Sequence, residues 1–216
     1  MKKPFSAWKV GAPYYVPVIL IGVVLMAAFW SSALVWLGVV VLGLGLFMLS
    51  FFRDFPRSAD AKPNDLVSPA DGTIVAIEEI ESTPHYDGRC KRISIFLSVF
   101  NAHVNRSPIS GTVTAIVYKE GQFKNAMRAD TSQINEANAV KMDTAHGPVT
   151  VRQISGAIAR RIVCPIQVGD TLAQGEKFGM IKFGSRTELY VVPSAEVYVK
   201  IGQKVFAGST ILGRLP

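Results

Sequence analysis

Between Lys9 and Arg53 the sequence contains no charged residue. A helix that crosses a bilayer needs about 20 apolar residues, and about 17 still suffice. The stretch is long enough for two such helices, and the polar pair Ser31 and Ser32 interrupts it near its middle. The sequence therefore predicts an α-helical transmembrane hairpin with spans at about 14–30 and 33–52.

Positive charges on both sides of the hairpin predict its orientation. Lysine and arginine concentrate in cytoplasmic segments, and here they precede and follow the spans while the turn between the spans has none: Lys2, Lys3, Lys9, Arg53, Arg57 and Lys62. Both ends are expected in the cytoplasm, with the hairpin in the cell (inner) membrane. A signal peptide over residues 1–30 is the alternative, disfavoured by the second apolar span and by a poor small-residue cleavage pattern.

The formal net charge of +7, from 23 basic and 16 acidic residues, is consistent with two explanations. Basic residues beside a membrane anchor attract anionic lipid headgroups, or they serve only topology and solubility. No nucleic-acid-binding motif is present, so nucleic acid is not an expected partner. The two cysteines, Cys90 and Cys164, make no disulfide framework and have no CxxC or CxxH neighbour, so we expect no metal site.

From residue 55 onward the sequence consists of short β-branched and apolar runs between glycine, proline and aspartate. This pattern predicts a mainly β domain over residues 55–216, preceded by a membrane anchor over residues 1–54. Residues 121–139 are polar and rich in asparagine, and we expect a long loop there, with room for a short helical turn.

Two internal repeats refine the fold. "SPADGTIVAI" at 68–77 returns as "SPISGTVTAI" at 107–116, and "VGDTLAQGEKFGMI" at 168–181 returns as "IGQKVFAGSTILGR" at 201–214. Glycines with this spacing make tight turns between short strands, as in lipoyl and biotinyl domains, so a barrel-sandwich-like soluble domain is expected. A carrier domain would also need a lysine in an "MKM" or "DKA" setting, which Lys119, Lys182 and Lys204 lack.

Three polar residues in short motifs could form a catalytic group. They are Asp71 in "SPADG", His103 in "FNAHVNRSP" and Ser185 in "FGSRTELY". A serine becomes a nucleophile when a base removes its proton and a third group orients that base. Each residue alone also has a structural interpretation, as a turn residue, a hydrogen-bonded loop residue and a turn cap.

These motifs together resemble the phosphatidylserine decarboxylase proenzymes. "FGSRTELYVVP" resembles the glycine-serine self-cleavage motif of that family, and "FFRDFPR" resembles the segment that leads out of its membrane anchor. "SPADGTI" and "AHVNRSPISG" resemble its aspartate and histidine segments. The similarity runs from about residue 50 to the end, in family order, and the length and the hairpin resemble the compact prokaryotic branch.

The resemblance implies self-cleavage between Gly184 and Ser185. The products would be a large fragment, 1–184, and a small fragment, 185–216, that stay associated. Ser185 would become a covalent pyruvoyl group, the only cofactor, whose ketone takes up electrons as carbon dioxide leaves a serine phospholipid. Glycine suits position 184 because it lacks a Cβ.

The chain departs from the family pattern at one position. Larger members carry a second histidine before the proline, and Arg106 takes its place here. The base for self-cleavage is therefore expected to be His103, alone or together with Asp71, with His146 in reserve. His85 is expected to be structural or solvated. The candidates for the lipid phosphate are three arginines that could equally be solvated: Arg106, Arg160 and Arg161.

The expected function is decarboxylation of phosphatidylserine to phosphatidylethanolamine at the cytoplasmic face of the membrane. Three alternatives stay open: an archaetidylserine decarboxylase, a non-catalytic membrane-anchored β module, and a decarboxylase of a soluble amino acid. The hairpin disfavours the last, because a soluble substrate gives no reason to hold an enzyme at the bilayer. The oligomeric state is left open.

Overall fold

The computed structural model describes residues 5–122, 134–156, 161–182 and 185–216. Two compact units make up the chain, Pro4–Phe55 and Pro56–Pro216. The first unit is helical, and the second is mainly β, as the sequence predicts.

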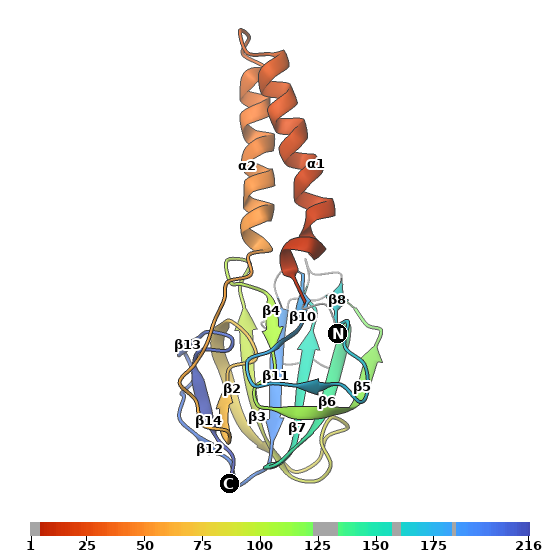
Figure 1. Cartoon of the computed structure of the whole chain (residues 1–216), viewed down its shortest axis with the longest axis vertical. Helices are drawn as coiled ribbons and strands as arrows, with labels where there is room; N and C mark the ends of the chain where they lie inside the picture. The colour runs from red at the N-terminus through yellow and green to blue at the C-terminus, as the bar shows by residue number, and fades with distance from the viewer. Residues whose placement is uncertain (1–4, 123–133, 157–160, 183–184) are drawn as a thin grey trace. The chain divides into compact units, whose positions relative to one another are not determined.

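The helical unit consists of α1 (Ala7–Ala28) and α2 (Val35–Phe51), joined by a short turn (Figure 1). α1 begins earlier than the expected span, and the Asp54 carboxylate accepts a hydrogen bond of 3.4 Å from the Ala7 N–H at its start. A carboxylate stabilises a helix N-terminus, where N–H groups are exposed. α1 is long and apolar enough to cross a membrane, whereas α2 has only 17 residues.

Glycines let the two helices approach closely. A Cβ on Gly22 would lie 2.6 Å from the backbone nitrogen of Leu42, and one on Gly45 would lie 2.9 Å from that of Ile19. Such small residues characterise helix contacts within membranes, where close backbone packing replaces the hydrophobic effect. The two helices therefore pack as a hairpin.

Among the described residues, the β domain contains three sheets. The largest has eight strands in the order β13-β2-β3-β11-β7-β6-β5-β9, and the smaller two have the orders β1-β14-β12 and β4-β10-β8. The strands are β1 (Asp65–Val67), β2 (Gly72–Ile80), β3 (Cys90–Leu97), β4 (Val104–Arg106), β5 (Gly111–Lys119), β6 (Ala137–Thr144), β7 (Gly147–Ile154), β8 (Ile162–Val163), β9 (Thr171–Leu172), β10 (Lys177–Ile181), β11 (Ser185–Val191), β12 (Glu196–Val197), β13 (Lys204–Val205) and β14 (Ile211–Arg214).

One secondary-structure prediction is wrong in part. The loop expected over 121–139 ends early, because β6 begins at Ala137 and pairs with both β5 and β7. Pairing on both sides overrides the weak strand propensity of its Asn-rich start. Residues 123–133 of this segment lie outside the described residues.

The repeated sequences fold into repeated structure. In the first repeat the Ser68 hydroxyl donates to the carbonyl oxygen of Ala70, and in the second Ser107 donates to that of Ile109, both at 2.7 Å. The two turns also hold one another, because the Arg106 N–H donates to the Pro69 oxygen at 3.0 Å. The matching bond, from the Val67 N–H to the Pro108 oxygen, is 2.9 Å long.

The second pair of repeats packs on the first in the same way. The Gly208 N–H donates to the Ser68 oxygen and the Gly175 N–H to the Ser107 oxygen, both at 2.8 Å. Gly208 and Gly175 have φ angles of 68° and 77°, a region that glycine adopts without a Cβ clash. The two halves of the domain therefore have one architecture, and the barrel-sandwich prediction is confirmed.

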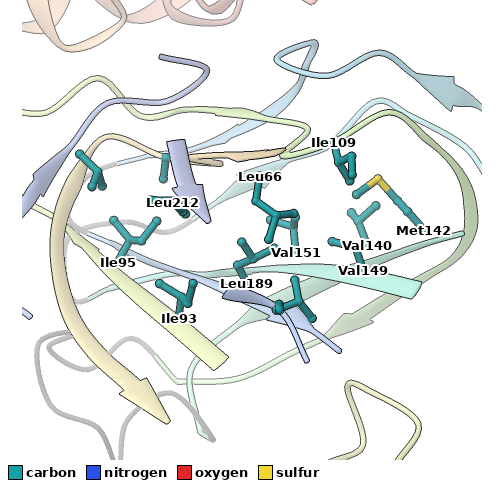
Figure 2. Packing of buried hydrophobic residues seen from close by; sticks show 14 of the residues in the cluster. Leu66, Ile93, Ile95, Ile109, Val140, Met142, Val149, Val151, Leu189 and Leu212 are labelled. Atoms are coloured by element: carbon teal, nitrogen blue, oxygen red, sulfur yellow. The ribbon is translucent and has the colours of Figure 1, made fainter. Parts of the chain in front are cut away.

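The apolar core lies inside the curved large sheet. Figure 2 shows Ile93 of β3, Val151 of β7 and Leu189 of β11 packed together with Leu66. All four side chains are buried. Alternate residues of these strands point to the core, as the period of two along a strand requires.

The outer face of the same strands carries a buried ion cluster centred on Glu188, which we call the Glu188 cluster. The Glu188 carboxylate accepts hydrogen bonds from the Tyr190 hydroxyl at 2.6 Å and from Nη1 of Arg152 at 3.1 Å. Two more guanidinium groups, of Arg92 and Arg186, lie 4.0 and 3.9 Å from its second oxygen. Glu188 is fully buried, so these partners offset the cost of removing its charge from water.

His85 lies beside this cluster, with its ring centroid 5.7 Å from that of Tyr190. Burial, and next the charge of Arg152, lower the pKa of His85 to about 4.

The unfolded chain binds a proton on His85 near pH 6.5, so the free energy of unfolding should fall as the pH drops from 6.5 to 4. We expect His85→Asn to lose less stability over this range. Urea unfolding of the detergent-solubilised chain at pH 7, 5.5 and 4.5 measures the difference, and parallel curves would contradict the assignment.

Candidate active site

Ser185 is the first residue of β11, where it pairs with Leu97 at the end of β3. Its side chain is fully buried, and its hydroxyl has no hydrogen-bond partner among the described residues. Buried hydroxyl groups normally find a partner, so an exception needs an explanation. Packing alone offers none, which makes this oxygen the first candidate for chemistry. Gly184 lies outside the described residues.

His103 precedes β4 on a segment that runs beside the chain leading to Ser185. The carbonyl oxygen of His103 accepts a hydrogen bond of 3.1 Å from the N–H of Ile181, four residues before Ser185. Together with the pairing of Leu97 and Ser185, this bond ties residues 97–103 to residues 181–185 at both ends. The structure therefore brings His103 and Ser185 onto adjacent segments.

The hydrogen bonds of His103 indicate which ring nitrogen could act as a base. The imidazole is fully buried, and its Nδ1 lies 2.9 Å from the carbonyl oxygen of Asn101. Since a carbonyl only accepts hydrogen bonds, Nδ1 carries the proton of this bond, and in the neutral ring Nε2 holds the lone pair. Nε2 is therefore the atom of His103 suited to accept a proton.

Asp71 is held by two partners in the turn before β2. Both of its oxygens accept from the guanidinium of Arg57, and Oδ1 also accepts from the Ala207 N–H at 2.8 Å. In the part of the chain that the structure describes, Asp71 makes no direct hydrogen bond to His103 or Ser185. Asp71 therefore does not join the expected group of Asp71, His103 and Ser185 through a direct hydrogen bond.

Asp71 and Ser185 nevertheless approach the same end of the large sheet. Thr73 of β2 pairs with Phe96 of β3, and Phe96 pairs with Arg186 of β11. Two strand spacings separate β2 from β11, which corresponds to about 10 Å. Asp71 therefore lies near Ser185 but beyond hydrogen-bonding range of its backbone.

The three candidate arginines have different settings. Arg106 is buried, and its Nη1 donates to the carbonyl oxygen of Gly175 at 2.9 Å. Its side chain therefore stabilises the turn that contains Gly175. Arg161 is exposed just before β8, where its carbonyl oxygen accepts from the Lys182 N–H at 3.2 Å, next to the segment before Ser185. Arg160 lies outside the described residues.

The structure removes His146 as a reserve base. His146 lies in the turn between β6 and β7, whereas Ile154 at the far end of β7 pairs with Arg186 beside Ser185. The length of β7, more than about 20 Å, separates the two ends. His85 is half-buried on the outer face of the sheet, consistent with a structural role.

A buried amide network beneath Ser185 was not predicted from the sequence. Asn105 donates from Nδ2 to the Pro69 oxygen at 3.2 Å and to the Thr187 hydroxyl at 3.1 Å, and its Oδ1 accepts from Gln153 at 2.9 Å. Asn138 continues the network by donating to Gln153 at 3.0 Å. The network joins the Asp71 turn to β11, two residues after Ser185. One feature of the sequence could have indicated this network: Gln153 follows Val149 and Val151 at alternate positions, which places a polar side chain on the inward face of the strand.

Asn105→Ala should destabilise the domain strongly, because it removes a fully buried side chain that makes three hydrogen bonds. Each buried group left without a partner costs about 1–3 kcal/mol. Asn64→Ala is the matched control, since Asn64 makes a single side-chain bond of 3.0 Å, to the Leu215 oxygen, at the periphery. Urea unfolding compares the two variants, and an equally small loss from both would contradict a central role of Asn105.

Comparison with known families agrees with this arrangement. The sequence model of the phosphatidylserine decarboxylase family matches residues 44–213. A phosphatidylserine decarboxylase proenzyme of Magnetococcus marinus is 43% identical over 219 residues, covering 100% of this chain and 98% of that protein. The proenzyme of Carboxydothermus hydrogenoformans is 39% identical, covering 100% and 99%. That of Polynucleobacter asymbioticus is 44% identical, covering 96% and 94%.

The match spans both the helical unit and the β domain, and it includes Asp71, His103, Gly184 and Ser185. Since the family model covers most of the chain and these relatives align along nearly their whole length, the chain belongs to the phosphatidylserine decarboxylase family.

Proposed function

We propose that this chain cuts itself between Gly184 and Ser185 and then decarboxylates phosphatidylserine to phosphatidylethanolamine. The observation that carries the proposal is the Ser185 hydroxyl, fully buried and without a hydrogen-bond partner among the described residues, at the start of a central strand. The relatives of this chain from Magnetococcus marinus and Carboxydothermus hydrogenoformans, which match it along nearly their whole length, are phosphatidylserine decarboxylase proenzymes. A name that denotes an unprocessed precursor fits a serine poised for reaction.

The cut begins at the Ser185 oxygen. Its attack on the carbonyl carbon of Gly184 moves the acyl group from nitrogen to oxygen, which replaces the peptide bond by an ester. Loss of the Cα proton of Ser185 then breaks the ester Cβ–O bond, leaving a carboxylate on Gly184 and dehydroalanine at position 185. Water converts dehydroalanine to a pyruvoyl group and releases ammonia, so no oxidant is needed.

His103 is the proposed base for this sequence. Its Nδ1 donates to the Asn101 carbonyl, so Nε2 carries the lone pair of the neutral ring. Asp71 is about two strands away and is bound by Arg57, so its proposed contribution is charge at the same end of the sheet. Arg106 at the position of the second family histidine is committed to the Gly175 carbonyl and is not proposed as a base.

Strand pairing provides a reason for the two fragments to stay together. The small fragment, 185–216, contains β11, which lies between β3 and β7 of the large fragment, 1–184. It also supplies β13, which pairs with β2, and β14, which pairs with β1. Cutting before β11 leaves all of these ladders intact.

The pyruvoyl group, when formed, supplies a ketone that withdraws electrons from the bond to the departing carboxylate. Burial of position 185 supports this role, because electrostatic interactions are stronger in a site with little solvent. Arg161 is the better-placed candidate for the lipid phosphate, since it is exposed near the segment before Ser185. Arg160 remains a candidate from the sequence alone, and Arg106 is the weakest because its side chain is buried and donates to the Gly175 carbonyl.

The helical unit is proposed to anchor the enzyme in the cell (inner) membrane, with the β domain in the cytoplasm. α1 is apolar enough to span a bilayer, and close packing of α2 on it supports a hairpin. The basic residues on both flanks favour cytoplasmic ends. In this arrangement residues 1–54 form the anchor and residues 55–216 the catalytic domain.

Intact mass spectrometry of the purified chain tests self-cleavage directly. We expect two fragments that divide after Gly184, the smaller one lighter by one ammonia than its sequence predicts. Ser185→Ala should give one uncut chain. An uncut wild-type chain that is folded and membrane-bound would contradict the proposal, as would a cut at another position.

Replacing Asp71 by serine separates a structural role from a chemical one. At the matching position of the second repeat, the Ser110 hydroxyl accepts from the Gln174 N–H at 3.0 Å, just as Asp71 accepts from Ala207. Asp71→Ser should therefore keep the turn while removing the charge. We expect self-cleavage to slow about a hundredfold, within the range of groups that assist proton transfer.

Self-cleavage during cell-free synthesis, followed on gels, measures this rate. Ser110→Ala is the control, since it removes the equivalent turn hydrogen bond without touching the charge, and it should be processed normally. Normal processing of Asp71→Ser would limit Asp71 to its structural role.

A further inference from the structure

A second buried serine faces Ser185 from the neighbouring strand. Ile154, the last residue of β7, pairs with Arg186 of β11. One step further along this register, Ser155 lies opposite Ser185. The strand continues through this step, because the N–H of Ser155 donates to the carbonyl oxygen of Glu136 at 2.9 Å, just before β6. Ser155 is therefore the cross-strand neighbour of Ser185.

The hydrogen bonds of Ser155 also indicate how close the two side chains come. Its N–H bonds to Glu136, and its carbonyl oxygen accepts from Nδ2 of Asn135 at 2.8 Å, so both groups are directed to the residues that immediately precede β6. In an antiparallel sheet, a residue that directs these groups to one neighbour forms a non-hydrogen-bonded pair with the other, with Cα atoms about 4.5 Å apart. Ser155 and Ser185 form such a pair.

Both side chains lie on the inward face of the sheet. Ser155 comes four residues after Val151, and Ser185 comes four residues before Leu189, and these two apolar residues belong to the core. Because side chains alternate along a strand, residues four apart share a face. Ser155 and Ser185 are fully buried, and neither hydroxyl has a hydrogen-bond partner among the described residues.

Two neighbouring hydroxyl groups without such partners need an explanation. Buried hydroxyl groups are normally bonded, and an alanine at either position would leave no polar side-chain atom unpaired. Side chains of directly opposed residues have Cβ atoms about 4.5–5.5 Å apart, and a serine oxygen has three staggered positions. Rotation of the side chains can therefore bring the oxygens of Ser155 and Ser185 into hydrogen-bonding range during a reaction at Ser185.

We propose that Ser155 is a further residue of the self-cleavage site, whose hydroxyl donates a hydrogen bond to the side-chain oxygen of Ser185. This inference rests on the proposed function and assigns Ser155 to its elimination step. In that step the Cβ–O bond of the ester breaks and its electron pair moves to the oxygen, while the Cα proton passes to a base and the Cα–Cβ double bond forms. The oxygen leaves as part of the carboxylate of Gly184.

The elimination is the step that a donor at position 155 favours most. During the attack the Ser185 oxygen gives electron density to the carbonyl carbon, whereas during the elimination negative charge develops on this oxygen. A donor that is already in place stabilises such a charge, most strongly where water is excluded. Ser155→Ala should therefore slow the elimination more than the formation of the ester, so that the ester accumulates.

Cell-free synthesis of the full chain, with and without hydroxylamine, measures the two steps separately. We expect pyruvoyl formation in Ser155→Ala to slow about tenfold or more, the effect of losing one hydrogen bond to a charged group. Hydroxylamine cuts the accumulated ester after Gly184, and the small fragment then begins with an intact serine. Mass spectrometry distinguishes this serine from a pyruvoyl group.

Ser94→Ala is the matched control. Ser94 is also fully buried, and its hydroxyl also has no partner among the described residues, but it pairs with Glu188 of β11 rather than with Ser185. Ser94 lies between Ile93 and Ile95 of the core, so its side chain points to the opposite face of the sheet. This variant should be processed at the normal rate.

Urea unfolding in the uncut background Ser185→Ala checks the fold. Ser155→Ala should cost no stability there, because it removes a hydroxyl without leaving a partner unpaired. Ser155→Cys, whose thiol is a weaker donor, should be processed at an intermediate rate, and it carries the test if alanine disturbs the fold.

An uncut wild-type chain would refute the proposed function itself. If the wild type is cut, three results would each overturn the role of Ser155: processing of Ser155→Ala at the normal rate, slow processing without an ester that hydroxylamine cuts, or equally slow processing of Ser94→Ala.

Discussion

The register of β11 determines where the proposed cut lies. Glu188 and Leu189 are neighbours on this strand, one in the Glu188 cluster and the other in the apolar core. A slip by one residue would bring the carboxylate into the core and the leucine among the arginines. Buried ion pairs often add little stability, but they can specify one arrangement. The Glu188 cluster and the core together therefore fix Ser185 at the end of β3.

A fixed register also accounts for a hydroxyl that lacks a partner. An unsatisfied buried polar group costs about 1–3 kcal/mol, so the surroundings must hold Ser185 in place. β11 is paired with β3 along all seven of its residues and with β7 along five of them, Arg186 to Tyr190. Thr187 adds a hydrogen bond to the amide network. The strand can therefore tolerate an unpaired oxygen at its first residue.

The sequence allowed much of this to be predicted. The strand pattern located β2 and β5 at the expected residues, 72–80 and 111–119, and the repeats indicated the barrel-sandwich arrangement. Short motifs also identified Asp71, His103 and Ser185, which reach one end of the sheet. These are local signals, readable from neighbouring residues.

The contacts that position the site could not be predicted in the same way. Asn105 and Gln153 are 48 residues apart in sequence, and nothing local indicates that they bond. Glu188 and Arg152 are 36 residues apart, and each reads as a polar position of a half-exposed strand. The start of β6 was missed because its stability comes from partners on both sides rather than from its own sequence. Long-range pairing decides all three.

The internal repeat separates what Asp71 does for the fold from what it adds. Asp71 and Ser110 occupy matching positions in the turns of the two repeats, and each accepts a hydrogen bond from the turn that faces it, at Ala207 and at Gln174. A serine suffices for that bond, so the fold alone does not require a carboxylate at position 71. Asp71 differs from Ser110 in its contact with Arg57, whose guanidinium donates to both carboxylate oxygens. Arg57 follows the helical unit in the sequence. Holding a charge there, two strands from Ser185, needs a reason beyond the turn, and the proposed reaction provides one.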